Sequence, residues 1–245
     1  MGEEKLRLSK LMASQGICSR READDLISKG CVRVDGETIT ELGTKVLPSA
    51  KVTLSQKGKD LLGKKVTIIL NKPIGYLSSP SDDPYPLAQK LILPTNQDRR
   101  DRSRNRFSPY HLKGLASAGR LDIDSKGLLI LTQDGVLAKK IIGQESRIDK
   151  EYLVRVEGDI TKAKLETLRF GLSLDDKPLK RAGVKELEPC LLQFVLLEGR
   201  KRQIRRMCEA VDLKVVSLKR VRVGRLKLGP LKEGQWRYLG KKEQV

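Results

Sequence analysis

Apolar residues recur along the chain with two different periods, and the pattern predicts both helices and strands. Near the N-terminus, spacings of three and four residues predict a short helix from Leu8 that Gly16 is placed to end. Ser19 and Glu22 form a capping-box pattern, which predicts a second helix that ends at Gly30. We therefore expect the chain to open with a tight pair of helices.

Strands are predicted where apolar residues alternate with polar ones or form short runs. Residues 31–34 alternate, and Asp35-Gly36 in front of residues 37–39 is a strong signal for a two-residue β-hairpin. Further strands are predicted at 66–70, 128–131, 152–156 and 191–197, and helices at 136–142, 161–170 and 198–207. This alternation of strands and helices favours an α+β fold.

Two segments lack a sustained apolar period. Residues 55–65 are rich in Lys and Gly, which predicts a flexible linker and a boundary near Gly63, with units at 1–60 and 64–245. Residues 98–106 contain no apolar residue, which predicts a mobile loop because there is little surface to bury. This loop is compatible with a solvated spacer and equally with an arm that orders on RNA.

Charge then narrows the choice of partner. Lys and Arg number 50 against 31 Asp and Glu, so the formal charge is +19, and the pI is near 9.9. A polyanion, and nucleic acid above all, is the natural partner of such a chain. No apolar stretch approaches the roughly 20 residues of a membrane span, and the N-terminus lacks a signal sequence, so we expect a soluble, cytoplasmic protein. We also expect a monomer.

Metal binding is not indicated. The four cysteines form no CxxC pair, and His111 is the single histidine, so a zinc site would lack both spacing and ligands. We expect four reduced thiols.

Basic side chains gather on the predicted N-terminal unit. These side chains either contact RNA phosphates or form a charged face exposed to solvent. The basic character of the whole chain favours phosphate contact. The residues concerned are Lys10, Arg20, Arg21, Lys29 and Arg33. The stretch from Glu4 to Leu54, with its GICSRREAD core, closely resembles the RNA-binding module first named after small-subunit ribosomal protein S-four, and this resemblance implies binding to structured RNA.

Candidate chemistry centres on residues 119–135, GRLDIDSKGLLILTQDG. Here Arg120 and Asp122 come just before a buried strand, so a carboxylate is presented from a loop beside a permanent cation. Tyr152 lies at the start of another strand, where a tyrosine is more often a core or rim residue. The segment EGRKRQIRRM follows the strand at 191–197 and carries a cationic cluster suited to phosphate binding and carboxylate pairing.

These motifs occur in a specific order. GRLDxxSxGLLxLTxDG, KEYLVxVEG and GRKRQIRRM, followed by Leu218, Arg220, Gly224 and GQWRYL, resemble the ribosomal RNA pseudouridine synthases of the RsuA, RluB, RluE and RluF group. NKPxG at residues 71–75 belongs to the same resemblance, which covers nearly the whole chain and is strongest to the RluF branch, whose substrate is large-subunit ribosomal RNA. It implies a mixed, mostly antiparallel sheet flanked by helices, and isomerisation of uridine without metal or cofactor.

The resemblance also implies roles for individual residues. Asp122 matches the catalytic aspartate, Tyr152 the tyrosine that stacks on the uracil, and Arg205 the arginine that pairs with that aspartate and keeps it ionised. Ile204 is expected as an apolar wall of the pocket, while Arg120 would either contact the RNA backbone or brace the loop. Further substrate contacts are expected from Arg200, Arg202 and Arg206.

Alternatives remain at this point. Asp124 and Asp134 are expected to bind backbone amides locally, which disfavours a mechanism with two carboxylates. A non-catalytic RNA-binding or ribosome-assembly protein would explain the charge, but not the matched Asp122, Tyr152 and Arg205. A transfer RNA substrate is not excluded by any residue.

Overall fold

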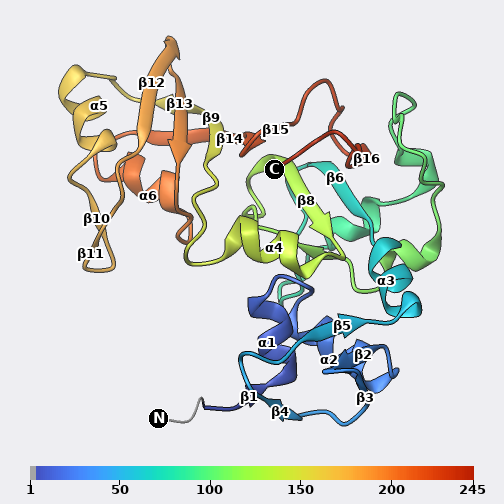
Figure 1. The fold of residues 1–245 in the computed structure, drawn as a ribbon. Coiled ribbons are helices and arrows are strands. Elements are labelled where there is room, and N and C mark those ends of the chain that lie inside the picture. Colours follow the sequence, from blue (N-terminus) through green and yellow to red (C-terminus); the bar gives the residue numbers. More distant parts are fainter. Residues whose placement is uncertain (1–3) are drawn as a thin grey trace.

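The computed structural model describes residues 4–245 and shows an N-terminal unit below a larger one (Figure 1). The elements of the N-terminal unit are β1 (Leu6–Arg7), α1 (Leu8–Ser14), α2 (Arg20–Ser28), β2 (Val32–Val34), β3 (Glu37–Ile39), β4 (Lys45–Val46), β5 (Val52–Leu54) and α3 (Gln56–Gly63). The predicted helix pair and hairpin are confirmed. Ser19 Oγ accepts a hydrogen bond from Glu22 N and the Glu22 carboxylate accepts one from Ser19 N, so the capping box is formed.

The N-terminal unit has a hydrophobic core of its own. Leu8, Leu11 and Met12 on α1 pack against Leu26 and Ile27 on α2 and against the inner face of the β2–β3–β5 sheet. Because these apolar side chains are buried among themselves, the basic residues of the unit are left on its outside.

The flexible linker predicted for residues 55–65 is wrong over most of its length, because residues 56–63 form helix α3. Ser55 caps the helix by accepting a hydrogen bond from Gly58 N, and Leu62 packs on the N-terminal core. Gly58 is buried against Cys31, where any side chain would be crowded. The absence of a clear apolar period was misleading, since the contacts of this helix come from the Ser55 cap, Gly58 and Leu62.

The larger unit is built on a nine-stranded sheet among the described residues, in the order β12-β13-β9-β14-β8-β6-β16, with β15 beside β14 and β7 beside β8. Its strands are β6 (Thr67–Lys72), β7 (Ala116–Ser117), β8 (Lys126–Thr132), β9 (Lys150–Glu157), β12 (Gly183–Glu188), β13 (Leu191–Leu196), β14 (Lys214–Val223), β15 (Leu226–Lys227) and β16 (Trp236–Tyr238). Strands β14 and β8 run parallel and the other pairs antiparallel, which confirms the expected mixed, mostly antiparallel sheet.

Both faces of this sheet are covered. The helical and hairpin elements are η1 (Ala88–Leu91), η2 (Pro94–Asn96), η3 (Pro109–Leu112), α4 (Gly135–Ile142), α5 (Lys162–Arg169), β10 (Ser173–Leu174), β11 (Lys177–Pro178) and α6 (Gln203–Glu209). Helices α5 and α6 pack with Leu70 and Leu129 on one face, and α4 packs with Ile69 and Leu128 on the other. Neighbouring residues of β6 and β8 thus face opposite cores, as the alternation of a strand requires.

The arginine-rich segment 98–106 is more firmly attached than its composition suggests. Asp98 is buried, accepts hydrogen bonds from Arg100 and donates its backbone N–H to Trp236 O at 2.8 Å. The carboxylate of Asp101 accepts from Tyr238 N at 3.0 Å. The backbone of Asp98 and the carboxylate of Asp101 therefore fix the start of the segment through Trp236 and Tyr238, and such polar contacts leave no apolar pattern in the sequence.

None of the helices in residues 4–245 is long and apolar enough to cross a membrane.

Candidate active site

The loop between β7 and β8 carries Asp122, and hydrogen bonds from outside the loop fix its backbone. Ser78 Oγ donates to Leu121 O at 2.7 Å and accepts from Leu121 N at 2.9 Å. Gly75 N donates to Ile123 O at 2.9 Å. Gly75 of the NKPIG turn and Ser78, three residues later, therefore support the loop on the two sides of Asp122. The role of Ser78 was not predicted from the sequence.

Arg220 on β14 holds the same loop from the opposite side. Its guanidinium donates to Gly119 O, Arg120 O and Leu128 O at 3.1, 3.3 and 2.8 Å, and the residue is only 1% exposed. Gly127 lies opposite Arg220 in the β8–β14 ladder, so closely that a Cβ there would collide with the Arg220 backbone. The side chain thus ties the start of the loop to the strand that follows it.

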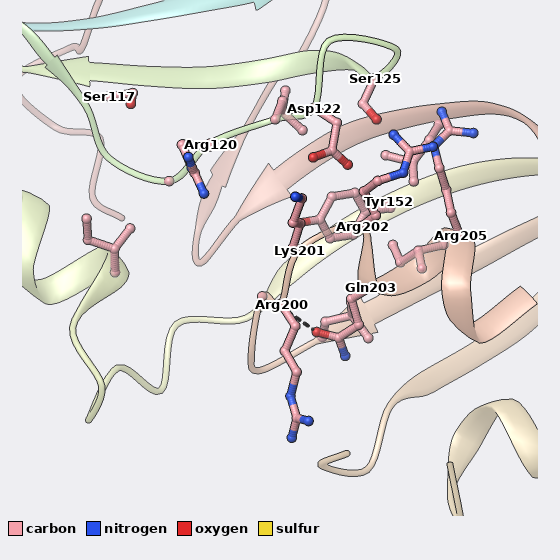
Figure 2. Close-up of a pocket in the computed structure, with 17 residues that line it drawn as sticks. Ser117, Arg120, Asp122, Ser125, Tyr152, Arg200, Lys201, Arg202, Gln203 and Arg205 are labelled. Carbon is pink, nitrogen blue, oxygen red and sulfur yellow. Dashed lines mark hydrogen bonds between the residues drawn. The ribbon is translucent and has the colours of Figure 1, made fainter. Parts of the chain in front are cut away.

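The loop opens onto a cavity of about 410 Å³. Figure 2 shows the Asp122 carboxylate directed into this cavity, on the side of the Tyr152 ring. Within residues 4–245 the carboxylate forms no hydrogen bond or ion pair with another side chain. Asp122 is therefore a carboxylate held on a rigid backbone, with its oxygens free for a ligand.

Tyr152 and Ile204 both line the cavity. Tyr152 lies on β9 opposite Arg220 of β14, so the strand that braces the loop also sets the position of the ring. Ile204 lies in the first turn of α6 and is buried, as is the Tyr152 ring apart from 8% of its surface. A flat aromatic face next to an aliphatic side chain suits a planar ligand.

The cationic segment before α6 is a turn rather than the predicted helix. The helix begins at Gln203, and Arg202 has a left-handed backbone with φ 51°. Gln203 closes the turn by accepting a hydrogen bond from Arg200 N at 2.9 Å. A non-glycine residue in the left-handed region is uncommon, so the late start of the helix could not be predicted from the residue types.

The expected pairing of Arg205 with Asp122 is wrong. Arg205 Nε lies 3.2 Å from the carboxylate of Asp124, and Arg205 also donates to Asp124 O at 3.0 Å. Arg202 lies 3.1 Å from the same carboxylate. Asp124 had been expected to bind backbone amides, but it joins the loop to α6 and leaves Asp122 unpaired.

The other arginines of the segment have separate positions. Arg200 points away from Asp122 in Figure 2 and donates to the carbonyls of Leu174, Lys177 and Pro178. Arg206 pairs with Asp175 at 2.7 Å and does not line the cavity. Both arginines are thus engaged with the β10–β11 hairpin, although Arg200 also lines the cavity. The expected substrate contacts of these two residues stay predictions. The exposed side chain of Arg120 lines the cavity, and Arg220 and Ser78 brace the loop.

Lys72, at the end of β6, is a buried cation that sequence analysis did not single out. The residue is 0% exposed, and Nζ donates to Pro73 O at 2.8 Å. Burial lowers the pKa of Lys72 to about 8, and the negative charges of Asp124 and Asp122 oppose this effect. Its position in the NKPxG motif was the available signal. Lys72 thus places a positive charge close behind the loop.

The basic residues predicted for RNA contact lie exposed on the N-terminal unit: Lys10, Arg20, Arg21, Lys29 and Arg33. Lys29 forms an ion pair with Asp25 at 2.6 Å, and within the described chain the other four form no ion pair. Asp134, in contrast, caps α4 through the amides of Val136 and Leu137, as expected.

Two known protein families match parts of the chain. Residues 66–210 match the family described as RNA pseudouridylate synthase, and residues 6–52 match the S4 domain. The chain belongs to the RNA pseudouridine synthase family. It is an isomerase that acts on RNA, and the expected N-terminal RNA-binding module is confirmed as an S4 domain.

Related proteins are similar to this chain over most of their length. The chain is 34% identical to the ribosomal large subunit pseudouridine synthase B of Bacillus subtilis, over 86% of this chain and 82% of that protein. It is 33% identical to the dual-specificity RNA pseudouridine synthase RluF of Escherichia coli, over 99% and 78%. A crystal structure of a pseudouridylate synthase matches with a TM-score of 0.65 and 26% identity, over 96% of each chain.

Proposed function

We propose that this synthase isomerises specific uridines of ribosomal RNA, with large-subunit RNA as the preferred substrate, and that Asp122 is its catalytic residue. The observation that carries the proposal is the unpaired Asp122 carboxylate, held on a braced loop and directed into a cavity beside Tyr152. Relatives from Bacillus subtilis and Escherichia coli support the choice of RNA, since the first is named for the ribosomal large subunit.

The reaction breaks the bond between ribose C1′ and uracil N1 and forms a bond from C1′ to C5. The hydrogen at C5 leaves as a proton and N1 gains one, so no group is added or removed. Asp122 serves as nucleophile or base towards the nucleoside. No oxidant or other reactant is required by this balance.

The target uridine must leave its stack to reach Asp122, at a cost of a few kcal/mol. In the proposed complex the uracil ring stacks on Tyr152, with Ile204 as the apolar wall behind it. The tyrosine hydroxyl is then placed to help remove the C5 proton. Arg205 acts through Asp124, because their ion pair fixes the end of the loop against α6.

Phosphate contacts supply the binding energy for base flipping. We assign these contacts to Arg120 and Arg202, which line the cavity, and to the exposed Lys10, Arg20, Arg21 and Arg33 of the N-terminal unit. Residues 1–60 are then the RNA-docking unit with its connection, and residues 64–245 the catalytic unit.

Release of tritium from ribosomal RNA labelled at uridine C5 tests the proposal, with Asp122→Asn and Asp124→Asn as a matched pair. Asp122→Asn should bind RNA and release none, because an amide is neither nucleophile nor base. Asp124→Asn should slow the reaction while leaving it measurable. Release of tritium only from labelled transfer RNA would mean that the substrate is transfer RNA and not ribosomal RNA. Equal activity of Asp122→Asn and wild type would refute the catalytic role of Asp122.

A further inference from the structure

A groove separates the S4 domain from the catalytic unit and has a volume of about 1350 Å³. One wall comes from the start of α2 and the residues after α3, and the other from η3, β8 and the start of α4. In Figure 1 the S4 domain lies directly beneath α4. Glu22 joins the walls, because its carboxylate accepts from Lys65 Nζ and from Gly135 N at 3.2 Å.

Unpaired positive charge lines this groove from both sides. Arg20, Arg21 and Lys64 come from the S4 side and Lys113 from the catalytic side, and in the described part of the chain none of the four forms an ion pair. The acidic residues of the lining are already engaged, Glu22 with Lys65 and Asp25 with Lys29. The groove therefore offers cations to a polyanion.

An aromatic side chain stands at the same groove on a fixed backbone. Tyr110 in η3 is 81% exposed, yet Gln133 Nε2 donates to Tyr110 O at 3.2 Å and to Lys113 O at 2.9 Å. A hydrogen bond of 2.6 Å joins His111 Nδ1 and the Tyr238 hydroxyl. A large ring that is exposed while its backbone is anchored is suited to stack on an unpaired base.

The groove lies next to the active-site cavity. On strand β7, Ala116 lines the groove and Ser117, which faces the other side of the strand, lines the cavity. On α4, Ala138 lines the groove and Ile142 the cavity, and four residues of helix span about 6 Å. Helix α4 therefore borders both the groove and the cavity.

We propose that this interdomain groove binds an unpaired stretch of the substrate RNA beside the target uridine. One base stacks on Tyr110, and the phosphates on either side contact Arg20, Arg21 and Lys113. The inference rests on the proposed function, since it requires an RNA substrate in the Asp122 cavity. It assigns the groove a part in selecting the uridine, beyond the general affinity of the S4 domain.

Kinetics on ribosomal RNA from cells that lack the protein test the stacking contact. Tyr110→Ala should raise KM about 10-fold with kcat within 2-fold of wild type, because a base stack is lost before the chemical step. Tyr110→Phe should behave as wild type, and so should Tyr85→Ala, which removes an exposed tyrosine outside the groove. A KM for Tyr110→Ala within 2-fold of wild type would overturn the proposal.

Direct binding tests the phosphate contacts without any need for catalysis. The probes are an unstructured 20-nucleotide RNA and a duplex of equal length. Lys113→Gln should lower the salt slope of affinity for the single strand by about 1, and Lys185→Gln, exposed on β12, should leave it unchanged.

Equal salt slopes of affinity for Lys113→Gln and wild type would contradict the proposed role of the groove. Equal losses of affinity for the single strand and the duplex would contradict it as well. If the wild-type protein isomerises no ribosomal RNA, the proposed function fails, while the binding data still decide whether the groove holds an unpaired strand.

Discussion

Arg220 offers a sharp test of how the fold positions the loop that carries Asp122. It is buried and gives three hydrogen bonds to Gly119 O, Arg120 O and Leu128 O. Replacing it with methionine would leave these carbonyls without their donor, at about 1–3 kcal/mol for each carbonyl that stays buried. Removing the buried cation offsets part of this loss, so we expect Arg220→Met to lose about 3–5 kcal/mol of unfolding free energy.

Because a loss of that size is a large part of a typical stability of about 5–15 kcal/mol, the milder Arg220→Lys is the decisive variant. Lysine keeps the charge but lacks the planar fork that reaches several carbonyls at once. A loop displaced by about 1 Å is expected to lower kcat on the order of 100-fold. KM for RNA should change little, since the buried side chain cannot contact RNA.

The assay combines chemical unfolding with single-turnover pseudouridine formation at saturating RNA, and Asp122→Asn serves as the folded, inactive reference. We expect Arg220→Lys to be folded, with a low kcat and a nearly normal KM. A folded Arg220→Lys with wild-type kcat would refute the positioning role. Activity lost only in proportion to the unfolded fraction would refute it as well.

Three further predictions follow from buried and tethering groups. The pKa of Lys72 is about 8 in the folded protein, against 10.5 for an exposed lysine. Between these two pH values the unfolded state holds more protons than the folded state, so the free energy of unfolding should rise from pH 8 to 10.5. Lys72→Met should remove that rise in urea unfolding, and an unchanged pH profile would contradict the burial argument. Glu22→Ala should lower stability by about 1–3 kcal/mol and speed proteolysis between the two units, and equal proteolysis rates would contradict its tethering role. N-ethylmaleimide should modify Cys190 alone in the native protein, because Cys18, Cys31 and Cys208 are buried, and burial raises the pKa values of Cys18 and Cys208 to about 11 and 12. Adducts at any of these three buried thiols would count against this packing.

Local signals in the sequence predicted much of the fold. The Ser19 and Glu22 capping box, the Asp35-Gly36 turn and the apolar runs at 66–70 and 128–131 all depend on neighbours within a few residues, and the structure contains each of them. Helix α3 was missed because its support comes from Cys31 and Leu54, which contact Gly58 from outside the helix. The spacing of apolar residues within the segment cannot indicate contacts with residues outside it.

The candidate site divides in the same way. Motif resemblance pointed to Asp122, Tyr152 and Ile204, and the structure gathers them around one cavity. The ion pairs of the arginines could not be predicted from the sequence. Arg206 pairs with Asp175, which lies in a hairpin some thirty residues earlier. Arg205 pairs with Asp124, although Asp122 is only two residues away from it in the sequence. Charge patterns show which residues can pair, but the choice of partner depends on tertiary geometry.

Pseudouridine mapping of ribosomal and transfer RNA tests the central claim most directly. Three strains are compared, which carry the wild-type protein, Asp122→Asn or no protein. We predict that at least one uridine of large-subunit ribosomal RNA is modified in the wild type and unmodified in both other strains. Modification that persists in the Asp122→Asn strain but is lost without the protein would contradict the catalytic assignment.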